Sequence, residues 1–211
     1  MIKGIIFDLD GVLVHTDEMH YQAWKQIAER LGVRFDREIN NRLRGVARMA
    51  CMEILLEGMP PLSYEQKFAL AEEKNAAYRK LLETLSERDV DEEVVAVLKE
   101  LRSRGVKLAI GSSSKNAGFI LDKVKLTAYF DAISDGNNIT RSKPDPEVFC
   151  KAAEYLSLSP ADCAVVEDAC AGIDAAVAGG FYSVGIGDAS SYDKTDMKIQ
   201  RISEVLNLLN A

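Results

Sequence analysis

Short apolar runs and apolar positions at helical spacing alternate along much of the chain. Residues 4–7 are apolar on both faces, which predicts a buried strand of a parallel sheet. After residue 91, similar runs predict strands at residues 107–110, 132–134, 164–166, 182–185 and 197–199. Helical spacing predicts helices between them, around residues 94–104, 117–124, 146–156, 169–178 and 203–209. Such alternation with right-handed crossovers predicts a doubly wound, Rossmann-like parallel sheet.

The stretch between the first strand and residue 91 has a different pattern. Residues 16–31 carry apolar positions on one helical face, and Gly32 is a stop signal. Further helical patterns follow without any strand, at residues 36–43, 48–57 and 63–85. Four helices in a row predict a small bundle. We therefore expect an α/β core of residues 1–15 and 88–211, with an inserted four-helix-bundle cap of residues 16–87.

Reactive side chains follow several of the predicted strands. In doubly wound sheets, ligands bind beyond the carboxyl ends of the strands, so these side chains are expected to share one crevice. The first strand is followed by Asp8 and Asp10, the second by Ser112, Ser113, Ser114, Lys115 and Asn116, and the strand at 164–166 by Glu167 and Asp168, while Ser142 and Lys143 precede the helix at 146.

The carboxylates of this crevice would repel one another unless a cation lay among them. An oxygen-only ligand set without His or Cys suits Mg²⁺, which commonly also holds a substrate phosphate. Asp8 and Asp10 are two positions apart in an extended chain, so both side chains point the same way, one as nucleophile and one as general acid and base. The set predicts a phosphoryl-transfer site, although each motif alone is more often a turn, a polar loop or a helix cap.

Four short motifs carry a resemblance to a known family. Asp8-Leu9-Asp10-Gly11-Val12, Ser112, Lys143-Pro144 and Glu167-Asp168 resemble, in this order, the motifs of the haloacid dehalogenase superfamily of phosphohydrolases and mutases. A helical cap inserted after the first motif is a further similarity. Within that superfamily, residues 17–24, 43–48, 74–75, 113–116 and 142–146 most closely resemble the β-phosphoglucomutase family.

The resemblance implies a Mg²⁺ enzyme that interconverts β-glucose 1-phosphate and glucose 6-phosphate. It would work through an aspartyl-phosphate enzyme and a bound β-glucose 1,6-bisphosphate. The alternative is a Mg²⁺-dependent phosphatase of sugar phosphates or other small molecules on the same core site. A third hypothesis is a non-catalytic regulator that kept the fold, although every motif residue is intact.

By position, the resemblance also implies roles for the residues of the core. Asp8 would be the nucleophile, and Asp10 the acid and base for the sugar oxygens. Mg²⁺ would be held by Asp8, by Asp168 and by the backbone carbonyl of Asp10. Glu167 would be a further ligand of the ion or a partner in its outer shell. The transferring phosphoryl group would contact Ser112 and Lys143, and the other phosphate or the sugar would contact the segment of Ser113, Ser114, Lys115 and Asn116.

The cap residues implied by the resemblance would select the substrate. Arg48 would grip the distal phosphate, Gly45 and Val46 would bound the sugar pocket, and Thr16 would lie at the hinge of cap closure. A lone histidine on an apolar face is usually structural, yet His20 is expected to discriminate substrates together with Lys74. Trp24 is either cap core or pocket wall. Two positions differ from the family pattern. Arg44, which would contact the substrate and could shift the sugar contacts, replaces an expected lysine, and Cys51 replaces a small hydroxyl residue.

The composition limits the kinds of binding partner and the cellular compartment that we expect for this protein. The formal net charge of −7 disfavours a general nucleic-acid binder, which needs a positive field. The chain has four cysteines without a Cys-x-x-Cys pair and no apolar run near the ~18 residues of a membrane span. We therefore expect a cytoplasmic monomer that acts on a small phosphorylated sugar, without nucleic-acid or membrane partners.

Overall fold

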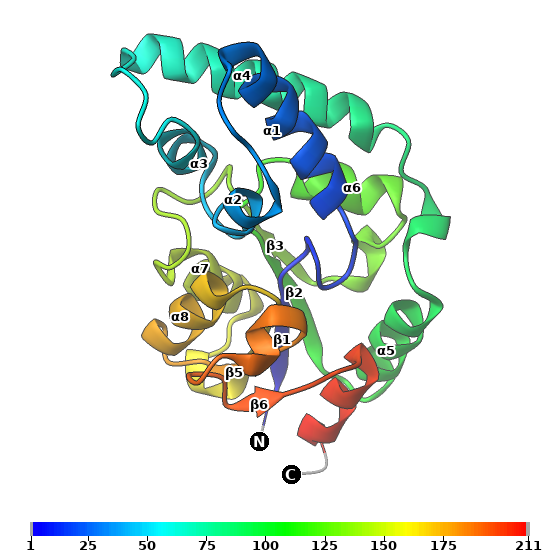
Figure 1. Ribbon diagram of the computed structural model, residues 1–211. Coiled ribbons are helices and arrows are strands. Elements are labelled where there is room, and N and C mark those ends of the chain that lie inside the picture. The colour runs from blue at the N-terminus through cyan, green and yellow to red at the C-terminus, as the bar shows by residue number, and fades with distance from the viewer. Residues whose placement is uncertain (1, 210–211) are drawn as a thin grey trace.

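The computed structural model describes residues 2–209 and contains a six-stranded parallel sheet (Figure 1). The strand order is β3-β2-β1-β4-β5-β6, and every paired strand runs parallel to its neighbour. This order confirms the doubly wound sheet. The strands are β1 (Gly4–Phe7), β2 (Lys107–Gly111), β3 (Ala132–Ser134), β4 (Cys163–Glu167), β5 (Tyr182–Gly185) and β6 (Met197–Lys198).

Helices connect the strands and form the layers around them. The α-helices are α1 (Asp17–Leu31), α2 (Arg37–Asn41), α3 (Arg48–Leu55), α4 (Tyr64–Leu82), α5 (Glu92–Ser103), α6 (Ala117–Lys123), α7 (Glu147–Leu156) and α8 (Cys170–Ala178). Short 3₁₀ segments are η1 (Glu87–Asp89), η2 (Thr127–Tyr129), η3 (Pro160–Asp162), η4 (Gly187–Ser191) and η5 (Ile202–Leu209).

The sheet is buried on both faces, as its continuous apolar strands require. Successive side chains of a strand point to opposite faces. Ile5 and Phe7 of β1 accordingly join one core cluster with residues of α5, α6 and η5, while Ile6 joins a second cluster with α7 and α8. Figure 1 shows α5 and the C-terminal segment on one side of the sheet and α7 and α8 on the other.

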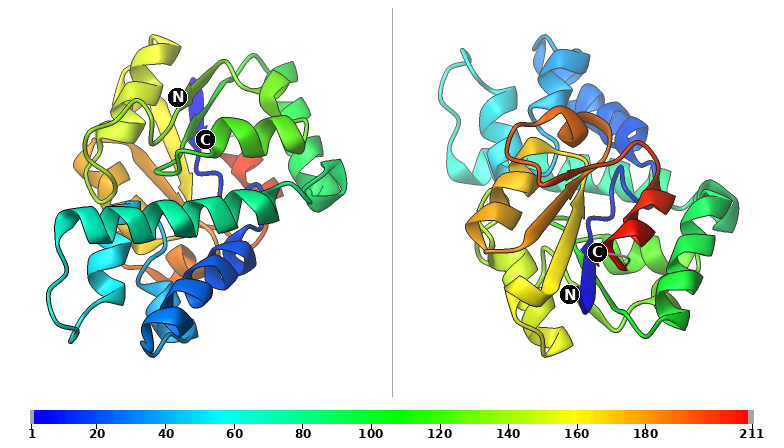
Figure 2. Two further views of the ribbon diagram at one scale, coloured as in Figure 1. Left: turned by 90° about the horizontal axis from the view of Figure 1, so that it is seen from above. Right: turned by 90° about the horizontal axis from the view of Figure 1, so that it is seen from below.

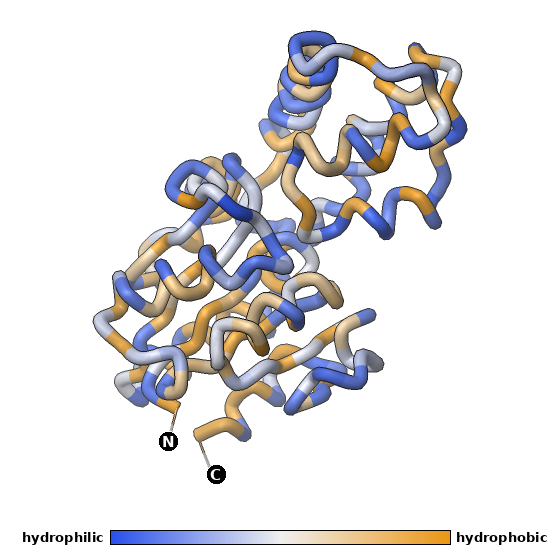
Figure 3. The backbone as a smooth tube through the Cα atoms, turned by 90° about the vertical axis from the view of Figure 1, so that its left-hand side faces the viewer, coloured by the Kyte–Doolittle hydropathy of each residue, from blue (hydrophilic) through white to orange (hydrophobic). Residues whose placement is uncertain are grey.

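Helices α1 to α4 form a separate layer beyond the carboxyl ends of the strands, opposite the chain termini (Figures 1 and 2). The long helix α4 crosses over this end of the sheet, as the view from above shows. The layer has its own apolar cluster, which includes Trp24, Ile27, Met52, Leu55 and Ala71. Figure 3 shows this layer as a lobe of mixed hydropathy, separate from the lobe that carries the two chain termini. The exact domain boundaries stay a prediction.

The helix ends differ from the sequence expectations in a few places. Asp36 caps α2 through its side chain, and the helix ends at Asn41 rather than at residue 43. The terminal segment is a 3₁₀ helix rather than an α-helix. Thr16 lies at the start of α1 but makes no side-chain cap, because its hydroxyl donates to Asp10 instead. Across residues 2–209, none of the helices has the length and apolar character needed to cross a membrane.

Candidate active site

A cavity of about 340 Å³ lies between the helical layer and the carboxyl edge of the sheet. Its walls come from both parts of the chain. Most of the sequence-predicted site residues line it, namely Asp8, Asp10, His20, Trp24, Arg44, Gly45, Val46, Arg48, Lys74, Ser112, Ser113, Ser114, Lys115, Asn116 and Asp168. Thr16, Lys143 and Glu167 do not line the cavity and are buried behind its wall.

Three buried carboxylates form the polar centre of the core side. Asp8, Glu167 and Asp168 each offer an oxygen within 4.8 Å of the others, so this cluster could hold a metal ion. The all-oxygen donor set fits a hard divalent cation such as Mg²⁺. Gly11 has a φ of +86°, and a Cβ there would lie only 2.0 Å from Asp168 Oδ2. A side chain at position 11 would therefore collide with the cluster.

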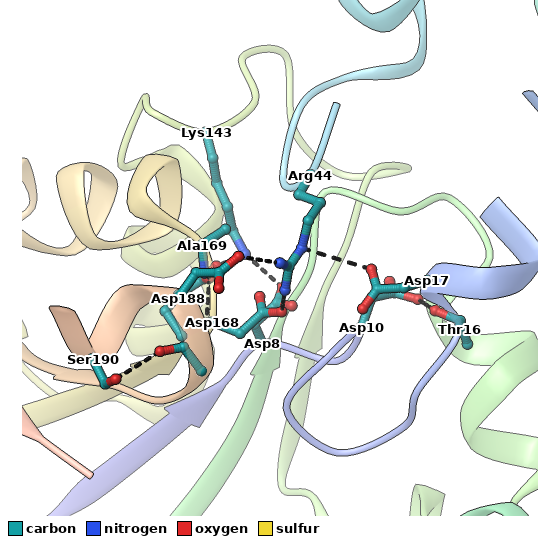
Figure 4. Close-up of polar contacts among 12 residues, drawn as sticks. Asp8, Asp10, Thr16, Asp17, Arg44, Lys143, Asp168, Ala169, Asp188 and Ser190 are labelled. Carbon is teal, nitrogen blue, oxygen red and sulfur yellow. Dashed lines mark hydrogen bonds and ion pairs between the residues drawn. The ribbon is translucent and has the colours of Figure 1, made fainter. Parts of the chain in front are cut away.

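Lys143 offsets part of the negative charge of this cluster from the side away from the cavity. Its Nζ atom is 2.5 Å from both Asp8 Oδ1 and Glu167 Oε1, and its side chain is fully buried. The other oxygen of Glu167 accepts from the backbone N–H groups of Asp168 at 2.9 Å and Ala169 at 3.0 Å. Burial alone would lower the pKa of Lys143, but the two carboxylates outweigh it and raise that pKa. The lysine is therefore a permanent cation, and Figure 4 shows it reaching the carboxylates.

Asp10 points toward the helical layer rather than toward the carboxylate cluster (Figure 4). Its Oδ1 accepts from the Thr16 hydroxyl and, at 3.4 Å, from the Tyr78 hydroxyl. Burial raises the pKa of Asp10, although the Thr16 hydrogen bond partly opposes this. A raised pKa favours the protonated form of the carboxyl group, which is the form that a general acid needs.

His20 and Lys74 form a polar pair on the helical side of the cavity. Lys74 Nζ lies 2.9 Å from His20 Nδ1, and also over the rings of Trp24 at 4.9 Å and Tyr78 at 4.5 Å. Burial lowers the pKa of Lys74 to about 7. Burial and the nearby Lys74 charge lower the pKa of His20, so its imidazole is neutral at pH 7. His20 Nε2 is 3.9 Å from Asp10 Oδ1, so the pair adjoins the acid.

Arg48, Asn75 and Asn116 line the cavity and are hydrogen-bonded to one another rather than to the carboxylate cluster, and we call this group the distal end. Arg48 pairs with Glu72 through Nη1 and donates from Nη2 to Asn75 Oδ1 at 2.9 Å. Asn116, from the loop after β2, donates from Nδ2 to the same Asn75 oxygen at 3.0 Å. Cationic and amide donors from the helical layer and the core therefore meet at this end.

The serine loop after β2 presents further donors. The Ser112 hydroxyl accepts from the backbone N–H of Ser114, and the Ser114 hydroxyl from that of Asn116, each at 3.1 Å. Within the described part of the chain, Ser113 Oγ is buried and has no hydrogen-bond partner. Lys115 is exposed on the same loop. The Ser112 and Ser114 hydroxyls act as acceptors in these bonds, so their own O–H groups can donate to an anion in the cavity.

Arg44 lines the cavity and also bridges the helical layer and the core, while its contact with the substrate stays a prediction. Its guanidinium pairs with Asp168 and, at 2.7 Å, with Asp188, and it is 3.7 Å from Asp17 (Figure 4). It therefore joins the helical layer to the carboxylate cluster of the core. The Cys51 thiol donates to the backbone oxygens of Leu43 and Val46 at 3.5 Å and 3.4 Å, as a hydroxyl could.

Several residues of the site were missed by the sequence analysis. Tyr78 lies four positions after Lys74, so the helical spacing of α4 could have placed it on the same face. Asn75 follows Lys74 directly and Glu72 precedes it by two positions, but nothing in the pattern indicated their partners. Asp188 lies in the loop after β5, where no motif marked it. The apolar rim residue Phe68 had no signal beyond helical spacing.

Comparisons with known proteins agree with this geometry. The family model described as haloacid dehalogenase-like hydrolase matches residues 2–180. A curated β-phosphoglucomutase of Bacillus subtilis (strain 168) is 38% identical, covering 99% of this chain and 94% of the relative. A phosphorylated carbohydrates phosphatase of Thermotoga maritima is 28% identical, and the alignment covers 85% of this chain and 82% of the relative. A crystal structure of β-phosphoglucomutase from Clostridium difficile superposes with a TM-score of 0.93 at 33% identity, covering 100% of this chain and 96% of that one. The chain belongs to the haloacid dehalogenase-like hydrolase family.

Proposed function

We propose that this protein is a β-phosphoglucomutase that interconverts β-glucose 1-phosphate and glucose 6-phosphate. The observation that carries the proposal is a pair of cations at two parts of one cavity, with Arg48 in its lining and Lys143 directly behind the lining residue Asp8. Lys143 lies beside Asp8 at the core end, and Arg48 lies near Asn116 at the distal end. A mutase must hold a sugar bisphosphate in two orientations, so it needs two anion sites that face one sugar pocket.

The proposed chemistry begins with Asp8. Its carboxylate attacks the phosphorus of a sugar phosphate, and the bond between phosphorus and the sugar oxygen breaks as the aspartyl phosphate forms. Asp10 donates a proton to the departing sugar oxygen and later removes one from the oxygen that attacks the aspartyl phosphate. The raised pKa of Asp10 supports the first of these tasks.

Charge stabilisation completes the proposed mechanism. Asp8, Glu167, Asp168 and the backbone carbonyl of Asp10 would hold Mg²⁺, which would offset the charge of the carboxylates and the phosphoryl oxygens. Lys143 and the Ser112 hydroxyl would hold the remaining oxygens of the transferring group. The distal phosphate would be held by Arg48, Ser114, Lys115 and Asn116, with Ser113 beside them.

The cavity-lining residues of the helical layer would determine which sugar binds and would exclude water from the site. His20 and Lys74 would contact sugar hydroxyls, with Trp24, Gly45 and Val46 as further walls. The links of Asn75 to Asn116 and of Arg44 to Asp188 hold the layer against the core. Excluding water favours transfer of the phosphoryl group to sugar over its hydrolysis. Thr16, next to this boundary, would be the hinge.

The competing function is a sugar-phosphate phosphatase. The Thermotoga maritima relative carries such a name, and the core chemistry up to the aspartyl phosphate would be the same. The two functions differ in whether sugar or water accepts the phosphoryl group.

A product assay separates the two functions. The full-length protein is given β-glucose 1-phosphate, Mg²⁺ and a catalytic amount of β-glucose 1,6-bisphosphate, and both glucose 6-phosphate and free phosphate are measured. A mutase forms glucose 6-phosphate, at a rate that depends on the bisphosphate. Free phosphate as the dominant product would contradict the proposal and favour the phosphatase. The α-anomer of glucose 1-phosphate is the matched control.

A further inference from the structure

We propose that Asn75 is a positioning residue that aligns Arg48 and Asn116 for the distal phosphate. This inference rests on the second anion site of the proposed function. The Asn75 side-chain oxygen accepts from Arg48 Nη2 at 2.9 Å and from Asn116 Nδ2 at 3.0 Å. One atom therefore holds a donor of the helical layer and a donor of the core.

The orientation of Asn75 follows from the chemistry of its partners. A guanidinium has only donors, so the atom of Asn75 that faces Arg48 must be the carbonyl oxygen. Asn116 must then turn its NH₂ group toward the same oxygen. Asn116 is 4% exposed, and its backbone N–H donates to the Ser114 hydroxyl, so the core side of the link is held in place. The fixed partner sets where Asn75, and through it Arg48, can lie.

The neutral charge of Asn75 is as important as its geometry. Glu72 already pairs with Nη1 of Arg48 and offsets part of its charge. A second carboxylate would offset the rest and repel a phosphate, whereas an amide oxygen orients the guanidinium and leaves its charge available. A phosphate that arrives between Arg48 and Asn116 then meets donors from both sides.

The link also connects ligand binding to the closed arrangement of the helical layer. Asn75 belongs to α4 and Asn116 to the start of α6, with the cavity bordered by both. When the layer lies away from the core, Asn75 cannot meet Asn116, so the two donors are aligned only in the closed arrangement. Asn75 thus makes the distal site depend on closure.

A double-mutant cycle tests this role through equilibrium binding. Glucose 1,6-bisphosphate is titrated, with Mg²⁺ present, into the full-length Asp8→Asn protein, which cannot form the aspartyl phosphate. We expect Arg48→Ala to weaken binding about 100-fold and Asn75→Ala about tenfold. Because Asn75 acts through Arg48 and Asn116, the Asn75→Ala effect should shrink in either the Arg48→Ala or the Asn116→Ala background. With both partners already replaced, Asn75→Ala should have no further effect.

Controls separate alignment from a general loss of structure. Asn41→Ala removes an exposed asparagine of the same layer that does not line the cavity, and it should leave binding unchanged. The thermal midpoint of every variant is measured alongside. A fully additive cycle, or an Asn75→Ala variant that binds as tightly as its parent, would overturn the proposal. So would a failure of the parent to bind the bisphosphate.

The cycle and the product assay give separate answers. If turnover ends in free phosphate while the cycle shows coupling, the mutase proposal fails and the role of Asn75 stands. If glucose 6-phosphate forms while the cycle is additive, the mutase proposal stands and Asn75 has no positioning role.

Discussion

The two ends of the cavity hold their charges in different ways. At the core end, the Lys143 side chain is 0% exposed and lies between Asp8 and Glu167, whose side chains are 10% and 1% exposed. At the distal end, the Arg48 side chain is 22% exposed and its partner Glu72 is 49% exposed. The core charges are thus paired inside the protein, whereas the distal pair is open to water.

This difference indicates how each end works. Breaking a buried ion pair leaves a charge uncompensated, so the core end keeps its arrangement until a bound ligand supplies a new partner. A half-exposed ion pair is held by about 1 kcal/mol or less, so a phosphate can replace Glu72 as the partner of Arg48. We expect the core end to supply the chemistry and the distal end to supply the choice of substrate.

The largest effect should come from Asp8→Asn at the core end. An asparagine cannot form the aspartyl phosphate, so turnover should fall by roughly 10⁴-fold or more. The rate of product formation from β-glucose 1-phosphate measures this. Asp174→Asn, on the core surface beside Lys194, is the control and should turn over normally. Unchanged turnover in Asp8→Asn would contradict the role of Asp8 as nucleophile, whereas no turnover in either protein would favour the non-catalytic regulator.

Lys143→Met should have the next largest effect and tests whether the core end is fixed. It leaves Asp8 and Glu167 buried without their cation, which should lower the free energy of unfolding by about 3–5 kcal/mol. Urea unfolding in the presence of a chelator measures this loss. We expect added Mg²⁺ to stabilise the variant more than the wild type, because the carboxylate cluster then lacks its other positive partner.

A surface ion pair provides the matched control for Lys143→Met. Lys194 Nζ lies 2.6 Å from Asp174 Oδ1, but the Lys194 side chain is 57% exposed. Lys194→Met should therefore change the free energy of unfolding by less than about 1 kcal/mol. Equal losses in the two variants would mean that the core end is no more fixed than the surface.

The sequence predicted the core end better than the distal end, for a physical reason. Apolar runs are local signals, and strand β3, predicted at residues 132–134, is observed as Ala132–Ser134. Parallel strands bring their carboxyl ends to one edge, so the convergence of Asp8, Glu167 and Asp168 followed from the order of strands and helices.

The contacts of the distal end depend on how the helical layer sits on the sheet. Helical spacing tells which side chains share a face of α4, but not which core residues that face meets. The bond between Asn75 and Asn116 and the ion pair between Arg44 and Asp188 both cross this boundary. Neither contact has a local signal in the sequence, so the sequence predicted neither of them.

Lys74→Met removes a buried positive charge on the helical side of the cavity. Unlike Lys143→Met, this substitution should stabilise the protein. Burial lowers the pKa of Lys74 from 10.5 to about 7, so keeping it protonated in the folded state costs free energy. The shift alone corresponds to roughly 5 kcal/mol. Lost contacts with the Trp24 and Tyr78 rings reduce the gain to about 2–3 kcal/mol.

The stability gained in Lys74→Met should decrease as the pH rises. Between pH 7 and 10.5 the unfolded state binds more protons at Lys74 than the folded state, so wild-type stability rises with pH in this window. The advantage of Lys74→Met in the free energy of unfolding should therefore be largest below pH 7 and vanish as pH approaches 10.5. Urea unfolding at pH 6, 8 and 10 measures it. An advantage that does not change with pH would contradict the burial of this charge.

The smallest effect should come from Glu72→Gln, which sharpens the account of the distal end. Glu72 competes with a phosphate for Arg48, and its own negative charge repels the ligand. Glutamine removes the charge while Asn75 still orients the guanidinium. The KM for β-glucose 1-phosphate should therefore fall about threefold to tenfold at low salt, with kcat nearly unchanged.

A control at Glu73 and the salt dependence of KM show whether Glu72 competes with the phosphate for Arg48 or orients Arg48. Glu73 pairs with Arg30 and does not line the cavity, so Glu73→Gln should leave KM unchanged. Because Glu72 is half exposed, the gain in Glu72→Gln should shrink as salt screens its charge in the wild type. A higher KM in Glu72→Gln would show that the carboxylate orients Arg48 rather than competes for it. The distal ion pair would then be as fixed as the pair at the core end, and the contrast between the two ends would disappear.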